Sequence, residues 1–275
     1  MKFFLDDDMV KVLIINPEFS ACAMLTDHFD IAVNKTFEVN KVYCLEEAEE
    51  VLYYFKPDFI FLDLDMSLKD ISNFLLYGQH SSASIIFTGQ YNPYFEKAIR
   101  FCSLHYLPNH LHADSVGNVI QKCLDRPITT SQKMQLYQVL IGNLQAKSVK
   151  NFQLAIVSDK RVCCFSPNDI VRFQADQEEV VVHLKNSSII TTGYTLWHFE
   201  TILQPLRFIR CHKFHLVNPV CITGITHDNH VTVSDGSCLE LYRRMAGEVL
   251  KHLNRARKIV LCTQSAMFPF EILSN

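Results

Sequence analysis

Acidic and hydroxyl side chains stand where apolar runs end in the first half of the chain. Asp63 lies near the end of the run 58–64, and Thr88 ends the run 83–88. If both runs are parallel strands, their carboxyl ends meet at one edge of a sheet, where such sheets place their functional groups. The pattern therefore predicts a site built around Asp63 at that edge.

Basic side chains gather in the last third of the chain. Lys213 closely follows Arg210 in the segment FIRCHKFHLVN, and Arg243 and Arg244 open the last predicted helix. Lysine supplies a point charge, and arginine supplies a fork of donors that fits phosphate or guanine. These residue types predict contacts with an anionic partner.

The net charge also differs between the two halves of the chain: the first half is acidic and the second is basic. Residues 1–127 hold ten basic and 18 acidic side chains, and residues 128–275 hold 16 and 11, for a formal net charge of −3. An acidic front and a basic back predict two modules, of which the second is compatible with nucleic acid. A composition of 48% hydrophobic and 20% charged residues is that of a globular protein and excludes a disordered or low-complexity chain.

The front half alternates short apolar runs with segments of helical periodicity. Five strands joined by helices predict a doubly wound parallel sheet, because parallel strands need crossover connections. The strands are predicted at 10–15, 37–42, 58–64, 83–88 and 104–107, and the helices at 19–31, 45–55, 94–101 and 111–124.

A helix is predicted between the two halves. Pro127 ends the preceding helix, and the hydroxyl side chains of residues 129–131 suit a helix start. Apolar residues then recur at intervals of 3, 4 and 3, which is the spacing of a coiled coil, at Met134, Tyr137, Ile141 and Leu144. Two interpretations remain open: a helix that forms a dimer, and a helix that packs on its own domains.

The back half has many short strands and few helices, which predicts a mainly-β domain. Strands are predicted at 154–157, 162–165, 170–173, 180–184, 189–192, 208–210, 214–217, 220–225, 230–233 and 238–241, and helices at 194–203 and 242–253. The fold class is thus α/β plus mainly-β. We predict the domains as 1–127, a linker helix 128–149, a β domain 150–254 and an extension 255–275.

The front half resembles the receiver domain of response regulators over about residues 10–126. The segment KPDFIFLDLDMS is similar to the third strand of that family, IIFTG to the fourth, and LHYLPN to the fifth. The resemblance implies a (βα)5 receiver-like domain in which Asp63 is the phosphoacceptor position for a histidine kinase. It also implies that Thr88 is the hydroxyl residue that ends the fourth strand beside the acceptor, and that Tyr106 is at the aromatic switch position.

The chain departs from the receiver pattern at the positions that bind magnesium and phosphate. The family's acidic pair is replaced by Asn16 and Pro17, and Glu18 is the acid nearby. Its lysine is replaced by Asn109, and its following proline by His110. Since Mg²⁺ prefers carboxylate ligands, we expect no cofactor and no magnesium-dependent phosphorylation.

Two other interpretations of Asp63 remain open. In one, it is still a phosphoacceptor, and Glu18 or Asp65 helps to hold the metal ion. In the other, it is a structural remnant that caps the junction of strand and loop.

The back half resembles the LytTR DNA-binding domain of bacterial transcription regulators over about residues 150–253. The order and spacing of four blocks carry the resemblance: DIVRFQAD, TTGYTLWHFETIL, FIRCHKFHLVN and VTVSDGSCLELYRRM. It implies a ten-stranded β fold whose loops enter successive major grooves of double-stranded DNA. The implied DNA-binding residues are Lys213, Arg243, Arg244, Arg210, Gln177 and Glu178. Asn218 matches a family asparagine that we interpret as structural.

Other constellations favour no enzymatic chemistry. The cysteine and histidine residues of 211–230 follow no standard zinc spacing, so no metal site is predicted. Cys211 and Cys238 could form a redox-sensitive pair, although buried inert thiols are the default. No nucleophile elbow or glycine-rich phosphate loop is found in the sequence, and we expect no membrane span and no signal peptide. The apolar residues of 258–275 predict docking onto the protein or a partner.

These observations predict a cytoplasmic, non-enzymatic transcription regulator of the two-component type. We expect a homodimer on repeated sites in double-stranded DNA, with a regulatory protein or ligand bound at the receiver-like domain and no membrane contact. One alternative is a protein-interaction module that has lost DNA binding, as the acids at 178–179 suggest. Another is a conventional response regulator that is phosphorylated on Asp63.

Overall fold

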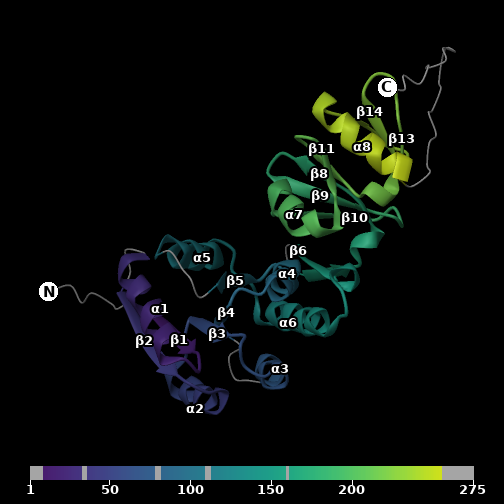
Figure 1. The fold of residues 1–275 in the computed structure, drawn as a ribbon. Helices are drawn as coiled ribbons and strands as arrows, with labels where there is room; N and C mark the ends of the chain where they lie inside the picture. Colours follow the sequence, from purple (N-terminus) through teal and green to yellow (C-terminus); the bar gives the residue numbers. More distant parts are fainter. Residues whose placement is uncertain (1–8, 33–35, 78–81, 109–112, 159–160, 256–275) are drawn as a thin grey trace, which may run out of the picture. The chain divides into compact units, whose positions relative to one another are not determined.

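The chain divides into two compact units, Met1–Cys164 and Phe165–Asn275, which are described separately (Figure 1). The computed structural model describes residues 9–32, 36–77, 82–108, 113–158 and 161–255. Asn109, His110 and the predicted docking segment 258–275 therefore lie outside the described residues. Within the described ranges, no helix is long and apolar enough to cross a membrane.

The first unit begins with a parallel sheet in the strand order β2-β1-β3-β4-β5. Its elements are β1 (Met9–Ile15), α1 (Phe19–Ala32), β2 (Thr36–Val42), α2 (Leu45–Phe55), β3 (Phe59–Asp63), α3 (Leu68–Tyr77), β4 (Ser84–Gly89), α4 (Pro93–Phe101), β5 (His105–Pro108) and α5 (Ala113–Asp125). All four strand pairings are parallel. The predicted doubly wound sheet is confirmed; the sequence pattern had not assigned α3.

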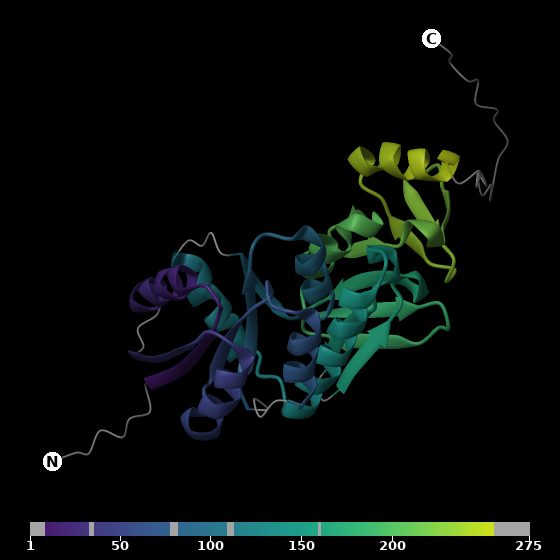
Figure 2. The same cartoon turned by 60° about the horizontal axis from the view of Figure 1, so that its bottom comes forward.

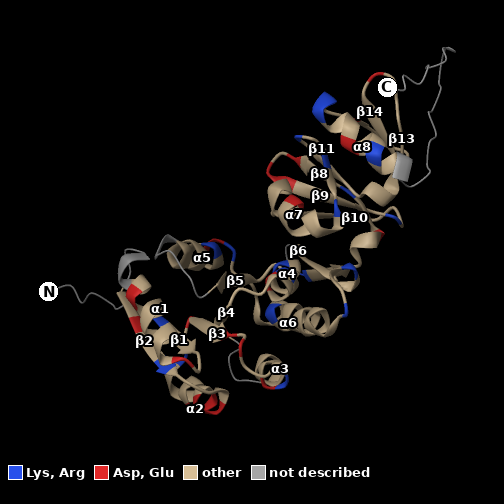
Figure 3. Ribbon diagram, in the orientation of Figure 1, with Lys and Arg blue, Asp and Glu red and all other residues tan. Residues whose placement is uncertain are grey.

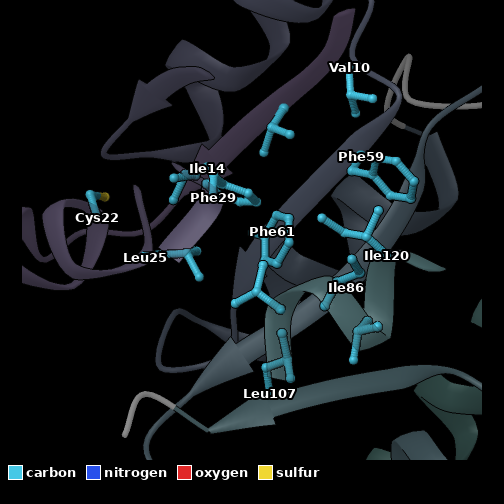
Figure 4. Packing of buried hydrophobic residues seen from close by; sticks show 13 residues of the cluster. Val10, Ile14, Cys22, Leu25, Phe29, Phe59, Phe61, Ile86, Leu107 and Ile120 are labelled. Atoms are coloured by element: carbon cyan, nitrogen blue, oxygen red, sulfur yellow. The ribbon is translucent and has the colours of Figure 1, made fainter. Parts of the chain in front are cut away.

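One face of this sheet packs against α1 and α5 (Figure 4). Val12 and Phe61 contribute from the strands, Phe29 from α1 and Ile120 from α5, and each is at most 1% exposed. Removing such a side chain from water stabilises the fold by roughly 1.5–3 kcal/mol. Because helices cover both faces of the sheet, its central strands are continuous apolar runs.

Helix α6 (Thr130–Gln145) starts with reciprocal capping bonds. Thr129 Oγ1 accepts the backbone N–H of Gln132 at 3.3 Å, and Gln132 Oε1 accepts the backbone N–H of Thr129 at 2.9 Å. The helix packs against α3 and α4 of its own unit and buries Leu136, Tyr137 and Leu140. This packing agrees with the second interpretation of the linker helix, and a role in dimer formation stays a prediction.

The first unit continues into the short helix η1 (Val149–Asn151) and the paired strands β6 (Leu154–Ser158) and β7 (Arg161–Phe165). Ser103 Oγ, just after α4, donates to the carbonyl of Ala155 at 3.0 Å. Asn143 on α6 exchanges two hydrogen bonds with the backbone of Gln153, at 2.8 and 3.0 Å. These bonds attach the segment around β6 to α4 and α6 of the same unit, and the predicted domain boundary at residue 150 stays a prediction.

The second unit contains two antiparallel sheets, as predicted for a mainly-β domain. The strand orders are β10-β9-β8-β12-β11 and β13-β14-β15. The elements are η2 (Pro167–Asp169), β8 (Ile170–Asp176), β9 (Glu179–Leu184), β10 (Ile189–Thr192), α7 (Leu196–Leu203), η3 (Gln204–Leu206), β11 (Ile209–His212), β12 (His215–Val217), η4 (Pro219–Cys221), β13 (Ile222–Ile225), β14 (His230–Val233), β15 (Cys238–Glu240) and α8 (Arg243–Arg255).

Two helices complete the packing of this unit. Helix α8 lies alongside the three-stranded sheet, where Val249 joins a buried cluster with Val217 and Val231 (Figure 2). Helix α7 packs against the larger sheet through Phe199, whose ring stacks on Phe173 with centroids 4.4 Å apart. The packing fixes the strand ends and the start of α8, which carry the predicted DNA-binding residues.

Candidate nucleic-acid interface and acceptor site

The first candidate site lies at the carboxyl edge of the parallel sheet. Asp63 ends β3, Thr88 is its register partner on β4, and Asn16 directly follows β1. Their side chains are buried, with residue exposures of 2% for Asp63, 4% for Thr88 and 5% for Asn16. The structure thus brings together the residues predicted at this edge, and Figure 3 shows the acids that follow β3 in red.

Both carboxylate oxygens of Asp63 accept hydrogen bonds from the protein itself. Asn16 Nδ2 donates to Oδ2 at 2.6 Å, and the backbone N–H of Asp65 donates to Oδ1 at 2.6 Å. The amide oxygen of Asn16 in turn accepts the backbone N–H of Glu18 at 2.8 Å. This second bond orients the amide so that its nitrogen, and not its oxygen, faces the carboxylate.

Burial is the main electrostatic effect on Asp63. It raises the pKa of the carboxyl from 3.8 to about 6, because desolvation disfavours the charged form. The bond from the Asp65 N–H lowers the pKa, the charges of Asp65 and Glu18 raise it, and the Asn16 bond lowers it. The Asp63 carboxyl is therefore hydrogen-bonded by two neutral donors, the Asn16 amide and the Asp65 N–H, and by no cation of the described residues.

The donor set at this edge does not fit Mg²⁺. The ion takes oxygen ligands in octahedral geometry, mostly carboxylates and water. At the position next to Asp63 the chain presents an amide nitrogen, and the side chain of Pro17 has no ligand atom. Asp65 Oδ2 accepts the backbone N–H of Gln90 at 3.0 Å. In the part of the chain that the structure describes, no group of three or more histidine, cysteine or acidic side chains could hold a metal ion.

Tyr106, the predicted switch residue, is turned into the protein. It is 8% exposed, and its hydroxyl donates to the carbonyl of Gln90 at 2.8 Å. Since the N–H of Gln90 binds Asp65, the tyrosine and the acidic edge share one backbone segment. The structure thus provides a physical connection between β5 and the loop after β3.

The second candidate site lies along one edge of the second unit. Two turns and the start of a helix meet there: the β8–β9 turn with Gln177 and Glu178, the β11–β12 turn with Lys213, and the start of α8 with Arg243 and Arg244. Two backbone bonds join these segments. The N–H of Ala175 donates to Phe214 O, and the N–H of Tyr242 donates to Cys211 O, each at 2.9 Å. Five of the six predicted DNA-binding residues thus project from adjoining segments.

The cations of this edge are exposed. Lys213, Arg243 and Arg244 form no ion pair with any residue of the described ranges. Lys213 Nζ lies 4.7 Å from the ring centre of Phe214, and the guanidinium of Arg244 lies 5.2 Å from that of Tyr242. An aromatic neighbour limits the directions that a long cationic side chain explores. Figure 3 shows the start of α8 in blue.

The β8–β9 turn adds negative charge to the same edge. Gln177 adopts a left-handed backbone conformation with φ of 52°, and Glu178 beside it is exposed. The turn therefore presents both side chains to solvent, next to the turn that carries Lys213. A carboxylate there can accept from cytosine N4, but it is repelled by phosphates.

Arg210, the sixth predicted residue, is bound within the protein. Its guanidinium donates to Glu200 Oε2 at 2.9 Å, to the carbonyl of His212 at 2.8 Å and to that of Lys213 at 2.6 Å. Sequence reasoning missed Glu200, because no motif connects a helical glutamate to an arginine ten positions later. A direct contact of Arg210 with DNA stays a prediction.

His212 is a second residue that sequence reasoning did not place. Its Nε2 lies 3.0 Å from Glu240 Oε2, and its ring centre lies 4.8 Å from that of Tyr242 and 5.5 Å from that of Phe214. The histidine thus lies between the β11–β12 turn and the start of α8. The sequence signal for this contact was that His212 and Phe214, which both carry rings, are two positions apart.

The remaining sequence candidates have structural surroundings. Asn218 is 3% exposed and donates to the carbonyls of Pro167 and Ile170 at 3.2 and 2.8 Å, in agreement with a structural role. Cys211 is buried and Cys238 is exposed, and both are free thiols. Burial raises the pKa of Cys211 to about 11, which disfavours its reactive thiolate. A redox pair of the two stays a prediction.

A parallel α/β unit with an acidic residue at its carboxyl edge is thus followed by an antiparallel unit with a basic edge. Comparisons with known proteins are specific about the second unit: residues 160–254 match the family described as the LytTr DNA-binding domain. The chain is also 26% identical over 253 residues to the sensory transduction protein LytT of Bacillus subtilis (strain 168), covering 90% of this chain and all of that protein. LytT of Bacillus anthracis is 24% identical over 255 residues, covering 89% and 99%.

Solved structures align with each part of the chain at low overall scores. The LytTr DNA-binding domain of a methyl-accepting/DNA response regulator from Bacillus cereus covers 37% of this chain and 95% of its own, with 21% identity and a TM-score of 0.32. The receiver domain of a DNA-binding response regulator from Colwellia psychrerythraea 34H covers 42% and 99%, with 16% identity and a TM-score of 0.36.

The chain therefore carries a LytTR DNA-binding domain at its C-terminal end and is homologous to the LytT response regulators. The two resemblances found in the sequence are confirmed at this level.

Proposed function

We propose that this protein is a sequence-specific, DNA-binding transcription regulator whose second unit reads repeated sites in double-stranded DNA as a homodimer. The observation that carries the proposal is that the β11–β12 turn with Lys213 adjoins the start of α8 with Arg243 and Arg244, and that the three cations have no acidic partners among the described residues. Turns can deliver side chains to base edges as well as a recognition helix can.

The three cations have different roles in this proposal. Arg243 binds a guanine through its two parallel donors, which gives sequence information. Lys213 supplies a point charge or donors to a base or a phosphate, and Arg244 contacts a phosphate. Gln177 and Glu178 occupy the β8–β9 turn, where Gln177 supplies the neutral polar contact.

A DNA selection with the purified full-length protein tests this function. We expect enrichment of a repeated motif whose halves are about one helical turn apart. The double variant Lys213→Ala, Arg243→Ala should lose the enrichment. A control variant, Lys185→Ala, removes a cation after the far end of β9, away from the β8–β9 turn, and should keep it. Failure of the parent protein to enrich any motif, at low and at moderate salt, would contradict the proposal.

We also propose that the first unit works without phosphorylation and takes its signal from a protein or ligand in the cytoplasm. The bond from the Asn16 amide to Asp63 Oδ2 supports this, because an amide stands at the position where the receiver family has a metal-binding acid, and an acceptor needs a metal to screen the developing charge. Incubation with Mg²⁺ and a small phosphodonor, followed by mass spectrometry, should leave Asp63 unmodified. A phosphate on Asp63 would support the conventional alternative.

A second candidate function is a protein-interaction module that no longer binds DNA. The exposed acids Glu178 and Glu179 beside the Lys213 turn favour it, since they oppose phosphate contacts. The DNA affinity of a variant that lacks the Glu178 charge distinguishes the two functions. A regulator gains affinity for DNA when Glu178 is neutralised, whereas the interaction module binds no DNA with either side chain.

A further inference from the structure

Arg210 links the β11–β12 turn to the rest of the second unit through three donors. Nε donates to the carbonyl of His212 and Nη2 to that of Lys213, at 2.8 and 2.6 Å. The third donor, Nη1, binds Glu200 Oε2 at 2.9 Å. The guanidinium therefore holds two successive carbonyls of the turn and one carboxylate of helix α7 at the same time.

The arginine acts at an irregular part of the turn, whose other end is held by the bond from the Ala175 N–H to Phe214 O at 2.9 Å. Lys213 and Phe214 form the two-residue connection between β11 and β12, and the register of these strands shifts between Arg210 and His212. A register shift interrupts the regular ladder of backbone bonds. The arginine fork supplies fixed donors at this interruption, and its planar geometry suits two adjacent acceptors.

The other end of this link is anchored in the core. Glu200 follows Phe199 on α7, and the Phe199 ring stacks on Phe173 of β8 with centroids 4.4 Å apart. The side chains of Arg210 and Glu200 are 25% and 41% exposed, so the ion pair lies at the surface but is not free in solvent. The position of the Lys213 backbone is thereby tied to the packing of α7.

We propose that Glu200 and Arg210 form a clamp that positions the β11–β12 turn for DNA, so that Arg210 acts through Lys213 and is not itself a DNA contact. The proposal rests on the proposed DNA-binding function. Arg210 and Glu200 are positioning residues in this scheme, and the side chain they position is the one that meets the nucleic acid.

The clamp and simple electrostatics predict opposite effects on DNA affinity when Glu200 is removed. Removing an acid close to a DNA-binding surface should strengthen binding, because a charge that repels phosphate is lost. If Glu200 is needed to hold Arg210, its removal should weaken binding. We expect Glu200→Ala to bind the selected DNA site about three- to tenfold more weakly. Glu248→Ala is the matched control, because this exposed acid on α8 forms no ion pair with any described residue, and it should bind equally well or more tightly.

Arg210→Lys tests the fork and the charge separately. Lysine keeps the positive charge but cannot hold two carbonyls and a carboxylate in one plane. The clamp predicts about tenfold weaker binding with an unchanged dependence on salt concentration. A direct phosphate contact predicts nearly full affinity for Arg210→Lys. By comparison, Lys213→Ala should reduce the salt slope by about one.

The experiment measures the affinity of the full-length protein for the selected site over a range of salt concentrations. Hydrogen exchange of the Lys213 and Phe214 amides is followed in parallel. Weaker binding together with faster exchange at these two amides, and unchanged exchange in β8, is the expected result. Unchanged or tighter binding by Glu200→Ala, or full affinity of Arg210→Lys, would overturn the clamp.

Two further observations keep the test decisive. Glu200→Gln preserves the shape of the side chain, so it replaces Glu200→Ala if that variant loses its fold by circular dichroism. If the parent protein binds no DNA, the proposed function fails, while the exchange of the turn amides still decides whether Glu200 and Arg210 order the turn.

Discussion

The two units treat the polar groups at their strand ends in opposite ways. In the first, Asp63 is 2% exposed and both of its oxygens are bound by Asn16 and the backbone. In the second, Lys213 and Arg243 stand exposed, without acidic partners among the described residues. A buried carboxylate that accepts bonds from its own protein is partly used by the fold, whereas an exposed cation keeps its full donor capacity. The comparison teaches that two units of one chain can place the polar groups at such an edge either inside the fold or in solvent.

The largest expected effect lies on the exposed side of this comparison. Arg243→Ala and Lys213→Ala should each weaken DNA binding by about tenfold or more, and together by about 100-fold. Arg243→Ala should relax the preference at one base position, and Lys213→Ala should weaken binding to all sequences and flatten the salt dependence. Affinity measurements on the selected site and on single-base variants check this. Equal loss of base preference in both variants would show that the assigned roles are wrong.

Asn16→Asp should create a magnesium site at the edge of the sheet that holds Asp63. The substitution places a carboxylate where an amide nitrogen now lies 2.6 Å from Asp63 Oδ2, so the variant should be less stable at neutral pH. Mg²⁺ should restore the stability, by about 2.7 kcal/mol at a hundredfold excess over its dissociation constant. Thermal unfolding with and without Mg²⁺ measures the effect, with Asn16→Ala as the control that adds no ligand. A magnesium response of the parent protein would contradict our account of this edge.

The contributions of Asp63 in the first unit and His215 in the second to the stability of the protein should change in opposite directions with pH. The pKa of Asp63 is raised to about 6, so its contribution to stability is present below pH 3.8 and is lost as the pH rises through 6. Burial, followed by the charge of Arg172, lowers the pKa of His215 to about 4, so its contribution is present above pH 6.5 and is lost as the pH falls toward 4.

Variants isolate these contributions from the other titrating groups. Relative to wild type, Asp63→Asn should gain stability as the pH rises from 4 to 7, and His215→Gln should gain as the pH falls from 6.5 to 4. Differences in melting temperature of about 2–4 °C are expected. His105 also has a pKa lowered to about 4 by burial, but it is present in all the proteins compared and cancels. Slopes of the same sign in the two variants would contradict the assignment.

The smallest effect is expected at the acidic turn of the second unit. Glu178→Gln should tighten DNA binding about twofold to threefold at low salt and less at high salt, because it removes one exposed repulsive charge. Titrations at two salt concentrations, with Glu248→Gln as the control, measure the difference. Weaker binding by Glu178→Gln would instead indicate that this carboxylate accepts a hydrogen bond from a base.

The sequence predicted the strands better than the contacts between distant side chains. β-Branched runs such as the one that became β1 define a buried strand locally, whereas α3 was missed between β3 and β4. Helix α6 (Thr130–Gln145) lies within the predicted linker 128–149, but its most buried residues are Leu136 and Leu140, and Met134 is only half-buried. The coiled-coil spacing did not reveal this face, because the helix packs on α3 and α4.

At the candidate sites, the residue types were more predictable than their partners. The loss of the acidic pair at Asn16 was visible in the sequence, but the bond from its amide to Asp63 spans 47 positions and depends on the sheet. Arg210 looked like a DNA contact because it is basic and adjoins Lys213. Its partnership with Glu200 depends on how α7 packs, which no local pattern specifies.

The attachment of β6 to the first unit bears on how such chains exchange modules during evolution. Phe152 is 0% exposed and its ring lies 5.1 and 5.4 Å from those of Tyr94 and Phe101 on α4, while Lys133 Nζ binds the carbonyls of Ser82 and Ala83. A recombination joint at residue 127 would remove Phe152 from α4 and leave an exposed apolar patch, prone to aggregation, on the N-terminal fragment. A joint after β6 would keep Phe152 with the first unit.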